Sequence, residues 1–413
     1  MKISKPNSEK ITGIIQLVSS KSESNRALII QAICDEVITI KNLSTSDDTN
    51  TLKLLLNRYK NSKVLDAHHA GTTYRFLTAF LSCQVGEWTL TGSDRMKERP
   101  IKILVETLRN NGANINYLEK DGYPPLLIKG SNLDLSNIQI DGSISSQYIS
   151  ALLLLGPSMS KATKFSFTDR VISKPYINMT LAIMDYFGAK TKWENGSILI
   201  EKNPYKTNSL SIESDWSAAS YWYQIVSLNN DSSVEIEGLK KQSFQGDSEV
   251  ANIFNQLGVE TIYKENSISI SNSNSAPLNK IELNLNNTPD LAQTIICTCA
   301  GLGIEATISG LETLVIKETN RLKALKNELL KFSVDLKIIE NHTLYLKSGQ
   351  TITNPTTSIE TYNDHRMAMA LAPLSLIVGS FRINNPEVVS KSYPNYWKDL
   401  ERVGFKISFS PKL

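Results

Sequence analysis

The sequence predicts a mixed α/β protein that is built from about six copies of one unit and folded as two domains. A helical run that ends in Gly and turns into a β-like run recurs along the chain, and a more apolar helical run precedes most of these copies. The chain of 413 residues is long enough for two or three domains of ordinary size.

The repeat is clearest where each helical run ends. Five copies reach this point at Gly112, Gly188, Gly258, Ser333 and Gly404. A weaker sixth copy runs through residues 51–64, and apart from a shorter first interval the spacing is about 70 residues. Gly ends a helix in the left-handed conformation, after which the chain turns back as a strand. Each unit is therefore predicted as strand, helix, strand, helix and further strands.

The more apolar helical runs are hydrophobic nearly all round, so we place them in a core. They cover residues 71–82, 146–155, 217–228, 290–300 and 364–376. The helices that end in Gly are amphipathic and should lie outside them.

Six such units are too many for one core, so we expect two domains of three units each. Polar stretches at residues 18–22 and 211–215 are candidate boundaries. We expect residues 20–213 to form the N-terminal domain, and residues 1–19 and 214–413 to form the second. A continuous array of units is the alternative.

Composition excludes several classes of protein. Hydrophobic residues make up 41% and charged residues 21%, and Lys+Arg 44 nearly balances Asp+Glu 41, so we expect no nucleic-acid partner. The four cysteines lack metal-binding spacing, so we expect neither a metal site nor a disulfide framework. The N-terminus lacks the pattern of a signal peptide, and no apolar run approaches the ~20 residues that span a bilayer. These features favour a cytoplasmic protein without a membrane partner.

The segment Lys317–Arg321 is the strongest functional candidate. It follows an apolar, β-prone run at residues 313–316 and precedes an amphipathic helix at residues 322–332. Two cations and Glu318 thus lie where a helix start favours an anion. A solvated helix start with an ordinary ion pair is the alternative.

Other charged and hydroxyl residues also gather at the predicted helix starts. Each group alone also suits an ordinary helix cap. Together they suggest a strongly cationic site for one or two small polyanions, with no need for a metal ion or cofactor. The cations are Lys21, Arg26, Arg99, Lys317, Arg321, Arg366 and Lys391.

These ordered motifs resemble the 5-enolpyruvylshikimate-3-phosphate synthase (EPSP synthase) family over nearly the whole chain. They are Lys21-Ser22-Glu23-Ser24-Asn25-Arg26, Ala70-Gly71-Thr72, Arg95-Met96-Lys97-Glu98-Arg99-Pro100, Ser145-Ser146-Gln147, Ser173-Lys174-Pro175-Tyr176, Gln245-Gly246-Asp247, Pro289-Asp290, Lys317-Glu318-Thr319 with Arg321, Tyr362-Asn363-Asp364-His365-Arg366, and Lys391-Ser392-Tyr393-Pro394. The resemblance implies an inside-out barrel of six βαβαββ repeats, three per domain, with the active site in the interdomain cleft.

The resemblance also implies the reaction and the site. Phosphoenolpyruvate would give its enolpyruvyl group to the 5-hydroxyl of shikimate 3-phosphate by addition and elimination, and phosphate would leave. Asp290 is implied as the base and Glu318 as the proton carrier, with Lys21 sharing the proton work. The implied shikimate 3-phosphate residues are Lys21, Ser22, Arg26, Ser145, Ser146, Gln147, Ser173, Tyr176, Asp290 and Lys317. The implied phosphoenolpyruvate residues are Lys21, Gly71, Arg99, Gln147, Arg321, Arg366 and Lys391.

Four positions depart from the family pattern: Thr313 stands in the place of Asn, Asn320 in that of Asp, Phe76 in that of Pro, and His69 in that of Asn. The family is the target of glyphosate, and the last two positions flank the Gly71 loop that would bind it. The alternatives are an enolpyruvyl transferase acting on UDP-N-acetylglucosamine and a non-catalytic anion-binding protein of the same fold. We expect a cytoplasmic monomer.

Overall fold

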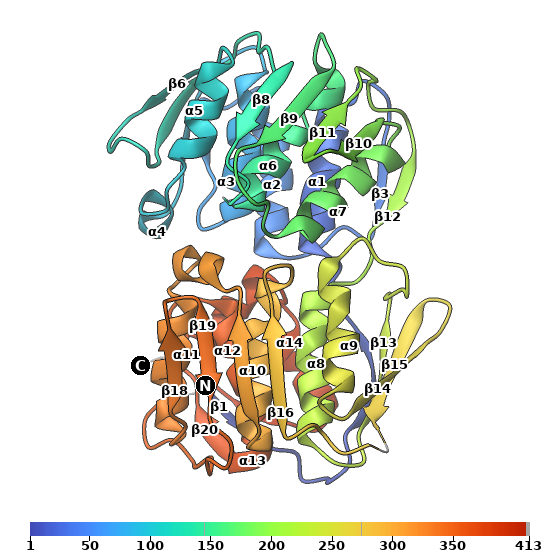
Figure 1. The fold of residues 1–413 in the computed structure, drawn as a ribbon, viewed down its shortest axis with the longest axis vertical. Coiled ribbons are helices and arrows are strands. Elements are labelled where there is room, and N and C mark those ends of the chain that lie inside the picture. The colour runs from blue at the N-terminus through green and yellow to red at the C-terminus, as the bar shows by residue number, and fades with distance from the viewer. Residues whose placement is uncertain (144, 274, 410–413) are drawn as a thin grey trace. The chain divides into compact units, whose positions relative to one another are not determined.

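The computed structural model describes residues 1–143, 145–273 and 275–409, and the chain divides into two compact units (Figure 1). The N-terminal unit is Ser19–Ile212, and the C-terminal unit combines Met1–Val18 with the chain from Glu213 onward. The chain therefore passes between the units twice, within the polar stretches at residues 18–22 and 211–215.

The N-terminal unit contains seven α-helices and a 3-10 turn among its described residues: α1 (Lys21–Ile33), α2 (Asp47–Arg58), α3 (Gly71–Ser82), α4 (Asp94–Lys97), α5 (Lys102–Asn110), α6 (Ser146–Leu153), η1 (Gly156–Ser158) and α7 (Lys174–Tyr186). Its strands are β3 (Thr39–Lys41), β4 (Val64–Asp66), β5 (Glu87–Thr91), β6 (Asn114–Tyr117), β7 (Leu126–Lys129), β8 (Asn137–Ile140), β9 (Thr163–Phe167), β10 (Thr191–Glu194), β11 (Ser197–Ile200) and β12 (Ser209–Ser211).

The helices of the C-terminal unit are α8 (Trp216–Leu228), η2 (Gly246–Glu249), α9 (Val250–Asn255), η3 (Pro289–Leu291), α10 (Ala292–Leu302), η4 (Glu312–Ile316), α11 (Arg321–Lys331), α12 (His365–Leu371), η5 (Ala372–Leu374), α13 (Ser375–Val378), η6 (Pro386–Lys391) and α14 (Tyr396–Arg402). Its strands are β1 (Lys2–Ser4), β2 (Thr12–Gln16), β13 (Ser233–Glu237), β14 (Val259–Tyr263), β15 (Ser267–Asn272), β16 (Lys280–Asn284), β17 (Glu305–Ser309), β18 (Leu336–Ile339), β19 (Thr343–Leu346), β20 (Ser380–Arg382) and β21 (Lys406–Ser408).

The sheets repeat one strand order. The four-stranded sheets are β4-β5-β7-β6, β8-β9-β11-β10, β2-β13-β15-β14 and β16-β17-β19-β18. In each sheet the first two strands run parallel and the other two pairs are antiparallel, as where Leu65 lies opposite Leu90 in the parallel pair β4–β5. Each unit adds a smaller sheet, β3-β12 in one and β20-β1-β21 in the other. The repeat read from the sequence is thus visible in the strand pairing.

A left-handed residue follows each of the five predicted amphipathic helices. The residues are Gly112, Gly188, Gly258, Ser333 and Gly404, and all of them have positive φ. Ser333, with φ of 66°, adopts the conformation that Gly adopts in the other copies. The prediction that Ser333 substitutes for Gly at this turn is confirmed.

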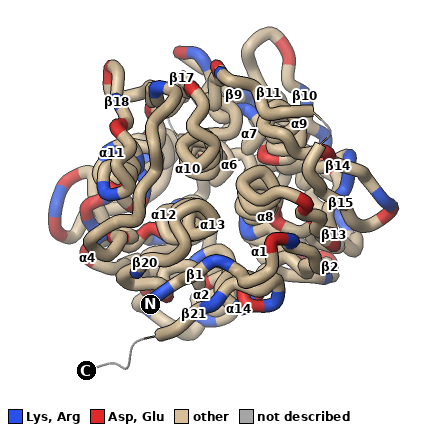
Figure 2. Tube along the Cα trace, turned by 90° about the horizontal axis from the view of Figure 1, so that it is seen from below, with Lys and Arg blue, Asp and Glu red and all other residues tan. Residues whose placement is uncertain are grey.

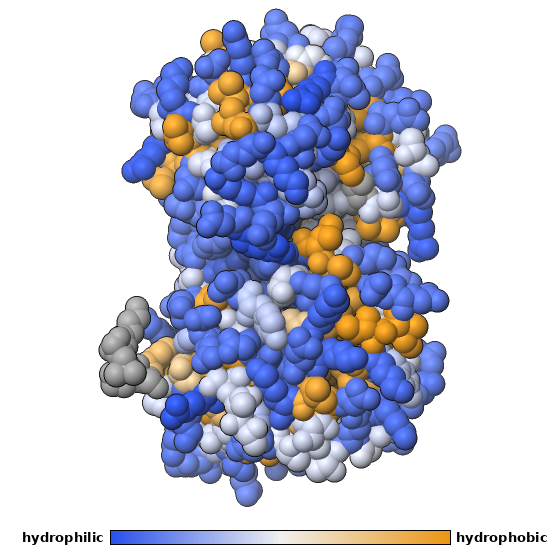
Figure 3. All heavy atoms as spheres, turned by 90° about the vertical axis from the view of Figure 1, so that its left-hand side faces the viewer, coloured by the Kyte–Doolittle hydropathy of each residue, from blue (hydrophilic) through white to orange (hydrophobic). Residues whose placement is uncertain are grey.

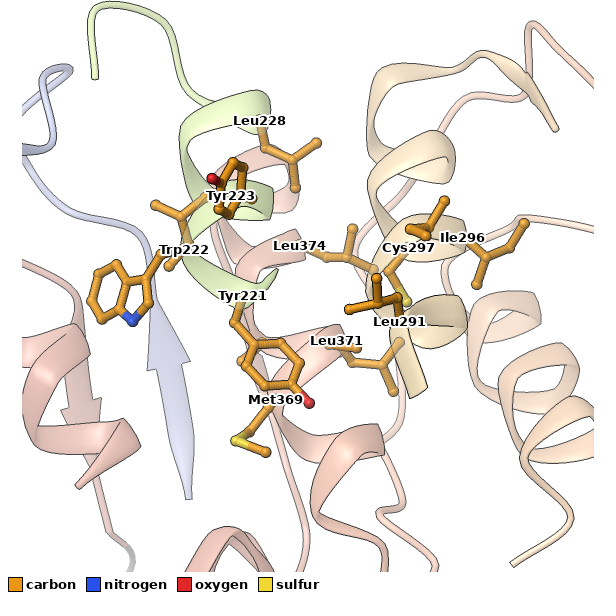
Figure 4. Packing of buried hydrophobic residues seen from close by; sticks show 14 of the residues in the cluster. Tyr221, Trp222, Tyr223, Leu228, Leu291, Ile296, Cys297, Met369, Leu371 and Leu374 are labelled. Carbon is orange, nitrogen blue, oxygen red and sulfur yellow. The ribbon is translucent and has the colours of Figure 1, made fainter. Parts of the chain in front are cut away.

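Apolar helices form the interior of each unit. Of the 13 residues of α8, all but Ser217 are buried, and α10 is buried along most of its length. Figure 4 shows Tyr221 of α8 close to Met369 and Leu371 of α12. The strands alternate buried and exposed residues, as in β8, so each sheet covers the helices with one face. The predicted mixed α/β class with helices inside is confirmed.

One local prediction is wrong. The run at residues 313–316 forms part of the 3-10 segment η4 and is not a strand. The preceding strand β17 ends at Ser309, Gly310 turns the chain with φ of 77°, and no described strand pairs with the run.

Charges of both signs are interspersed along the tube in Figure 2, and hydrophilic residues predominate on the face in Figure 3. Among the described residues, no helix is long and apolar enough to cross a membrane.

Candidate active site

The C-terminal unit gathers seven charged side chains at the starts of its buried helices. Asp290 lies in η3 just before α10, and Arg321 is the first residue of α11. Asp364 caps α12 by accepting a hydrogen bond from the backbone N–H of Arg366 at 2.9 Å. Lys317 and Glu318 lie between η4 and α11, and Lys391 ends η6. Because α10, α11 and α12 pack on one another, residues far apart in the sequence meet here.

Asp290 is surrounded by three cations. Its Oδ1 accepts a hydrogen bond from Arg321 Nη1 at 3.0 Å and lies 3.6 Å from Lys317 Nζ. Its Oδ2 accepts one from Arg366 Nη2 at 3.0 Å. Burial alone would raise the pKa of Asp290, but Arg366, Lys317 and Arg321 outweigh burial and hold that pKa well below its usual range. Asp290 is therefore an ionised carboxylate.

Glu318 bridges two other cations. Its Oε1 accepts a hydrogen bond from Lys391 Nζ at 2.6 Å, and its Oε2 accepts one from Arg321 Nη2 at 3.0 Å. The Glu318 side chain is 15% exposed, whereas those of Lys391 and Arg321 are 6% and 2% exposed. The carboxylate thus lies nearer to solvent than the cations that hold it.

Asp364 binds the guanidinium of Arg321 through two hydrogen bonds. The Asp364 side chain is fully buried and accepts from Arg321 Nε at 2.7 Å and from Arg321 Nη2 at 3.3 Å. Burial acts to lower the pKa of Arg321, but the carboxylates of Asp364, Glu318 and Asp290 raise it above its usual value. This paired arrangement fixes the plane of the guanidinium.

Lys317 is the most exposed cation of the cluster, with 24% of its side chain accessible. Burial and the positive charges of Arg321 and Arg366 lower its pKa, although Asp290 and Glu318 act in the opposite direction. An anion that binds next to Lys317 would therefore favour its charged form.

Asp247, which belongs to η2, is a further carboxylate at this site. Ser217 Oγ donates to its Oδ2, and its Oδ1 has no hydrogen-bond partner among the described residues. Burial and the negative charge of Asp290 raise the pKa of Asp247 to about 7, against the effect of Arg366. Asp247 is thus a buried group that titrates near neutral pH.

In the N-terminal unit, Arg26 joins three neighbouring helices, α1, α6 and α7 (Figure 1). It donates from Nε to Thr180 Oγ1 at 2.7 Å, from Nη2 to Ser150 Oγ at 3.1 Å and to the Tyr176 carbonyl at 3.1 Å, and from Nη1 to the Ser22 carbonyl at 2.8 Å. Burial lowers the pKa of Arg26 to about 10. Arg26 therefore holds the backbones of Ser22 and Tyr176 in place through their carbonyl groups.

Lys21 and the remaining hydroxyl and amide candidates of this unit also lie at helix starts. Lys21 begins α1, and its Nζ lies 3.5 Å from Asp48 Oδ2. Ser145 caps α6 ahead of Ser146 and Gln147, accepting from the Gln147 N–H at 3.4 Å. Ser173 precedes α7 with φ of 53°. Since Arg26 ties α1, α6 and α7 together near their N-terminal ends, their first residues share one region of the unit.

Gly71 and Arg99 are in close contact. Gly71 begins α3, and a Cβ atom placed on it would overlap the guanidinium of Arg99. Arg75 Nη1 donates to the Gly71 carbonyl at 3.0 Å from the next turn of the helix. Of the three cations in the 95–100 motif, only Arg99 is buried.

Arg95 and Lys97 point away from this contact. Arg95 pairs with Glu98 at 2.8 Å, and Lys97 pairs with Glu119 at 2.8 Å, both near the surface. Of the three cations in this motif, only Arg99 therefore lies against Gly71.

The positions that depart from the family pattern have distinct surroundings. Asn320 caps α11 by accepting from the Lys323 N–H at 3.2 Å, so the amide performs the usual role of an N-cap carboxylate. Phe76 is buried on α3, with its ring centre 5.7 Å from the guanidinium carbon of Arg26. His69 is exposed just before the Gly71 helix.

Sequence reasoning assigned no role to Asp48, Asp247 and Asp364, which the structure joins to the predicted residues. Asp247 and Asp364 belong to motifs of the family resemblance. For Asp364 the signal was an Asp just before an apolar helix, which also describes an ordinary cap.

Comparison with known proteins agrees with this arrangement. The family model described as EPSP synthase (3-phosphoshikimate 1-carboxyvinyltransferase) matches residues 6–60 and 56–400. A 3-phosphoshikimate 1-carboxyvinyltransferase of Bacteroides fragilis (strain YCH46) is 44% identical over 407 residues, covering 98% of each chain. The corresponding protein of Sulfurovum sp. is 37% identical over 420 residues, covering 95% of this chain and 97% of its own.

Two solved structures share the fold. An EPSP synthase of Acinetobacter baumannii aligns with a TM-score of 0.79 at 21% identity, covering 99% of each chain. The enolpyruvyl transferase NikO of Streptomyces tendae aligns with a TM-score of 0.78 at 14% identity, also covering 99% of each chain.

The fold is shared with an EPSP synthase and with another enolpyruvyl transferase. The chain belongs to the EPSP synthase family. It is a transferase of the shikimate pathway that moves the enolpyruvyl group of phosphoenolpyruvate to the 5-hydroxyl of shikimate 3-phosphate. The UDP-sugar and non-catalytic alternatives are not favoured.

Proposed function

We propose that the C-terminal cluster carries the proton chemistry of this transfer and that residues of both units bind the two substrates. Asp290 takes the proton of the 5-hydroxyl, and Glu318 carries a proton to the methylene carbon of phosphoenolpyruvate. Lys21 shares this proton work. The observation that supports the proposal best is the placement of Asp290 and Glu318 around one shared guanidinium, that of Arg321.

The addition step forms one C–O bond and moves two protons. The 5-hydroxyl oxygen attacks C2 of phosphoenolpyruvate and its proton passes to Asp290, while C3 gains a proton from Glu318 and becomes a methyl group. The product of this step is a tetrahedral intermediate. In the elimination step C3 returns a proton to Glu318 and the C2–C3 double bond forms again. The C2–O bond to phosphate breaks, and the departing phosphate takes the proton that Asp290 received.

Substrate charge explains how two carboxylates held by cations can do this work. Phosphoenolpyruvate carries a carboxylate and a phosphate, and we assign it to Arg321, Arg366, Lys391, Arg99, Gln147, Lys21 and the Gly71 backbone. An anion at Lys391 and Arg321 competes for the cations that keep Glu318 ionised, so binding favours the protonated acid. The same anion offsets part of the positive charge of Arg366 and Arg321. Asp290 is then less stabilised as a carboxylate and becomes a stronger base.

Shikimate 3-phosphate is assigned to the hydroxyl-rich helix starts of the N-terminal unit and to two residues of the C-terminal cluster, Asp290 and Lys317. The binding residues are Lys21, Ser22, Arg26, Ser145, Ser146, Gln147, Ser173, Tyr176, Asp290 and Lys317. Hydroxyl and amide groups suit the polyol ring and the phosphate oxygens. Arg26 contributes by holding the Ser22 and Tyr176 carbonyls.

We further propose that the enzyme works as a cytoplasmic monomer without metal or cofactor, and that glyphosate binds at its phosphoenolpyruvate residues. The cations already neutralise the substrate charge. Among the described residues, no group of three or more His, Cys, Asp or Glu could hold a metal ion.

Release of phosphate from phosphoenolpyruvate tests the proposal. Wild-type protein should release phosphate with shikimate 3-phosphate and should form the enolpyruvyl product in equal amount. UDP-N-acetylglucosamine in its place should give no release. Release that depends on the UDP-sugar would contradict the assignment of substrate, and release without any acceptor would contradict the transfer.

A further inference from the structure

Glu328 is a fully buried carboxylate that the proposed chemistry does not use. It lies on α11 seven residues after Arg321, which places both side chains on the same face of the helix. Its Oε1 accepts a hydrogen bond from Tyr362 Oη at 2.8 Å, and its Oε2 accepts one from the Glu360 N–H at 2.9 Å. Lys331 Nζ completes the pairing at 2.8 Å from Oε2.

The segment that Glu328 holds has an uncommon backbone. Tyr362 and Asn363 are consecutive residues other than Gly with φ of 54° each. Such left-handed residues persist only where their surroundings hold them. The chain leaves this turn directly into Asp364, whose carboxylate contacts Arg321 and caps the helix that carries Arg366.

Helix α11 therefore holds the turn at both of its ends. Arg321, at the start of α11, binds Asp364 through two hydrogen bonds of 2.7 Å and 3.3 Å. Glu328, two turns further along, binds Tyr362 and Glu360. Lys331 Nζ adds a contact to the Ser358 carbonyl at 2.9 Å. The position of Arg366 relative to Asp290 depends on the shape of this turn.

We propose that Glu328 is a positioning residue for phosphoenolpyruvate binding, because it fixes the Tyr362–Asp364 turn and thereby the Arg321 and Arg366 guanidinium groups. The inference rests on the proposed function, in which those two arginines bind phosphoenolpyruvate. Glu328 itself touches neither substrate in this account.

The test is Glu328→Gln, which keeps the size of the side chain but puts an amide where a carboxylate contacts three donors, Tyr362 Oη, the Glu360 N–H and Lys331 Nζ. We expect KM for phosphoenolpyruvate to rise about fivefold or more while KM for shikimate 3-phosphate stays within about twofold. Tyr362→Phe removes one of the same hydrogen bonds and should give a smaller rise in the same direction. The double variant should show less than the sum of the two effects, since both act on one contact.

Tyr345→Phe is the matched control, because it also removes a tyrosine hydroxyl from the C-terminal unit, where Oη lies 3.5 Å from Glu305. It should leave both KM values unchanged. A loss of stability alone would lower the amount of active enzyme and leave both KM values as they are. Tyr362→Phe protein that is folded and has an unchanged KM for phosphoenolpyruvate would overturn the inference, even if Glu328→Gln fails to fold. Failure of the proposed function would instead appear in the wild-type enzyme.

Discussion

Arg26 and Arg321 are both buried arginines near the start of a helix, yet their partners differ. Arg26 donates to hydroxyl groups and backbone carbonyls, and burial lowers its pKa to about 10. Arg321 binds three carboxylates, which raise its pKa above the usual value against the effect of burial. The hydrogen-bond partners of Arg26 are thus uncharged, whereas those of Arg321 are carboxylates, and we propose that this carboxylate network carries the proton chemistry.

This comparison predicts the largest loss for a change in the carboxylate network. Glu318→Gln keeps the shape of the side chain but cannot carry the proton to phosphoenolpyruvate. We expect kcat to fall by about 10²–10⁴-fold in a steady-state phosphate-release assay. Glu312→Gln, an exposed change in η4, is the control and should retain wild-type kcat. A kcat for Glu318→Gln within a factor of about three of wild type would remove Glu318 from the proton chemistry.

In the N-terminal unit, a change of shape should affect binding more than chemistry. Gly71→Ala places a methyl group against the Arg99 guanidinium. Overpacking of about 1–3 kcal/mol corresponds to a rise of about 5–150-fold in KM for phosphoenolpyruvate.

Gly349→Ala is the control for this change. Nothing lies within 4 Å of a Cβ added at Gly349, whose φ of 72° adds a backbone strain that Gly71→Ala lacks, so this variant is the more demanding change without the contact. It should leave KM unchanged, and an equal rise in both variants would contradict the close approach of Arg99 to Gly71.

Asp247 should make the stability of the fold depend on pH. The pKa of Asp247 is about 7 in the folded protein, above its ordinary value of 3.8. A raised pKa means that Asp247 stabilises the fold most below about pH 4 and that this contribution is lost as pH rises to about 7. Asp247→Asn should therefore gain in Tm over wild type as pH increases from 4 to 8.

Thermal unfolding across this pH range measures the effect. The gain should reach a few °C, since about 1 kcal/mol shifts Tm by about 2–4 °C in a domain of 150–250 residues. The exposed change Asp231→Asn should show no such trend. A difference between Asp247→Asn and wild type that stays constant with pH would contradict the raised pKa of Asp247.

The smallest effect is expected at Asn320. Asn and Asp cap helices about equally well, so Asn320→Asp should change the free energy of unfolding by less than about 0.5 kcal/mol. Arg321 is already held by Asp364, Glu318 and Asp290, so KM for phosphoenolpyruvate should stay within about threefold. Denaturant unfolding and steady-state kinetics measure the two quantities. A larger change in KM would mean that residue 320 contributes to holding Arg321.

Most of the fold could be predicted from local patterns in the sequence. Ser333 could be placed in a left-handed turn because four other copies of the repeat have Gly there. The run at residues 313–316 could not be assigned from its apolar, β-prone residues, because a strand also needs a partner and no described strand pairs with this run. Strand pairing is a property of the whole fold.

The sequence predicts which residues belong to the site, but it does not predict the contacts that depend on packing. Asp290, Glu318 and Arg321 were found by their motifs, and the structure brings them together. The contact of Arg321 with Asp364 joins residues 43 positions apart, and only the packing of α11 on α12 reveals it. The pairing of Arg95 with Glu98 and of Lys97 with Glu119 could likewise not be assigned from the sequence.

The most direct test of this account is phosphate release by Asp290→Asn in the presence of phosphoenolpyruvate and shikimate 3-phosphate. The amide keeps the shape of the carboxylate but cannot take the proton of the 5-hydroxyl. The account predicts folded protein that binds shikimate 3-phosphate and releases phosphate about 10²–10⁴-fold more slowly than wild type. Release at a rate near that of wild type would contradict the central role of Asp290.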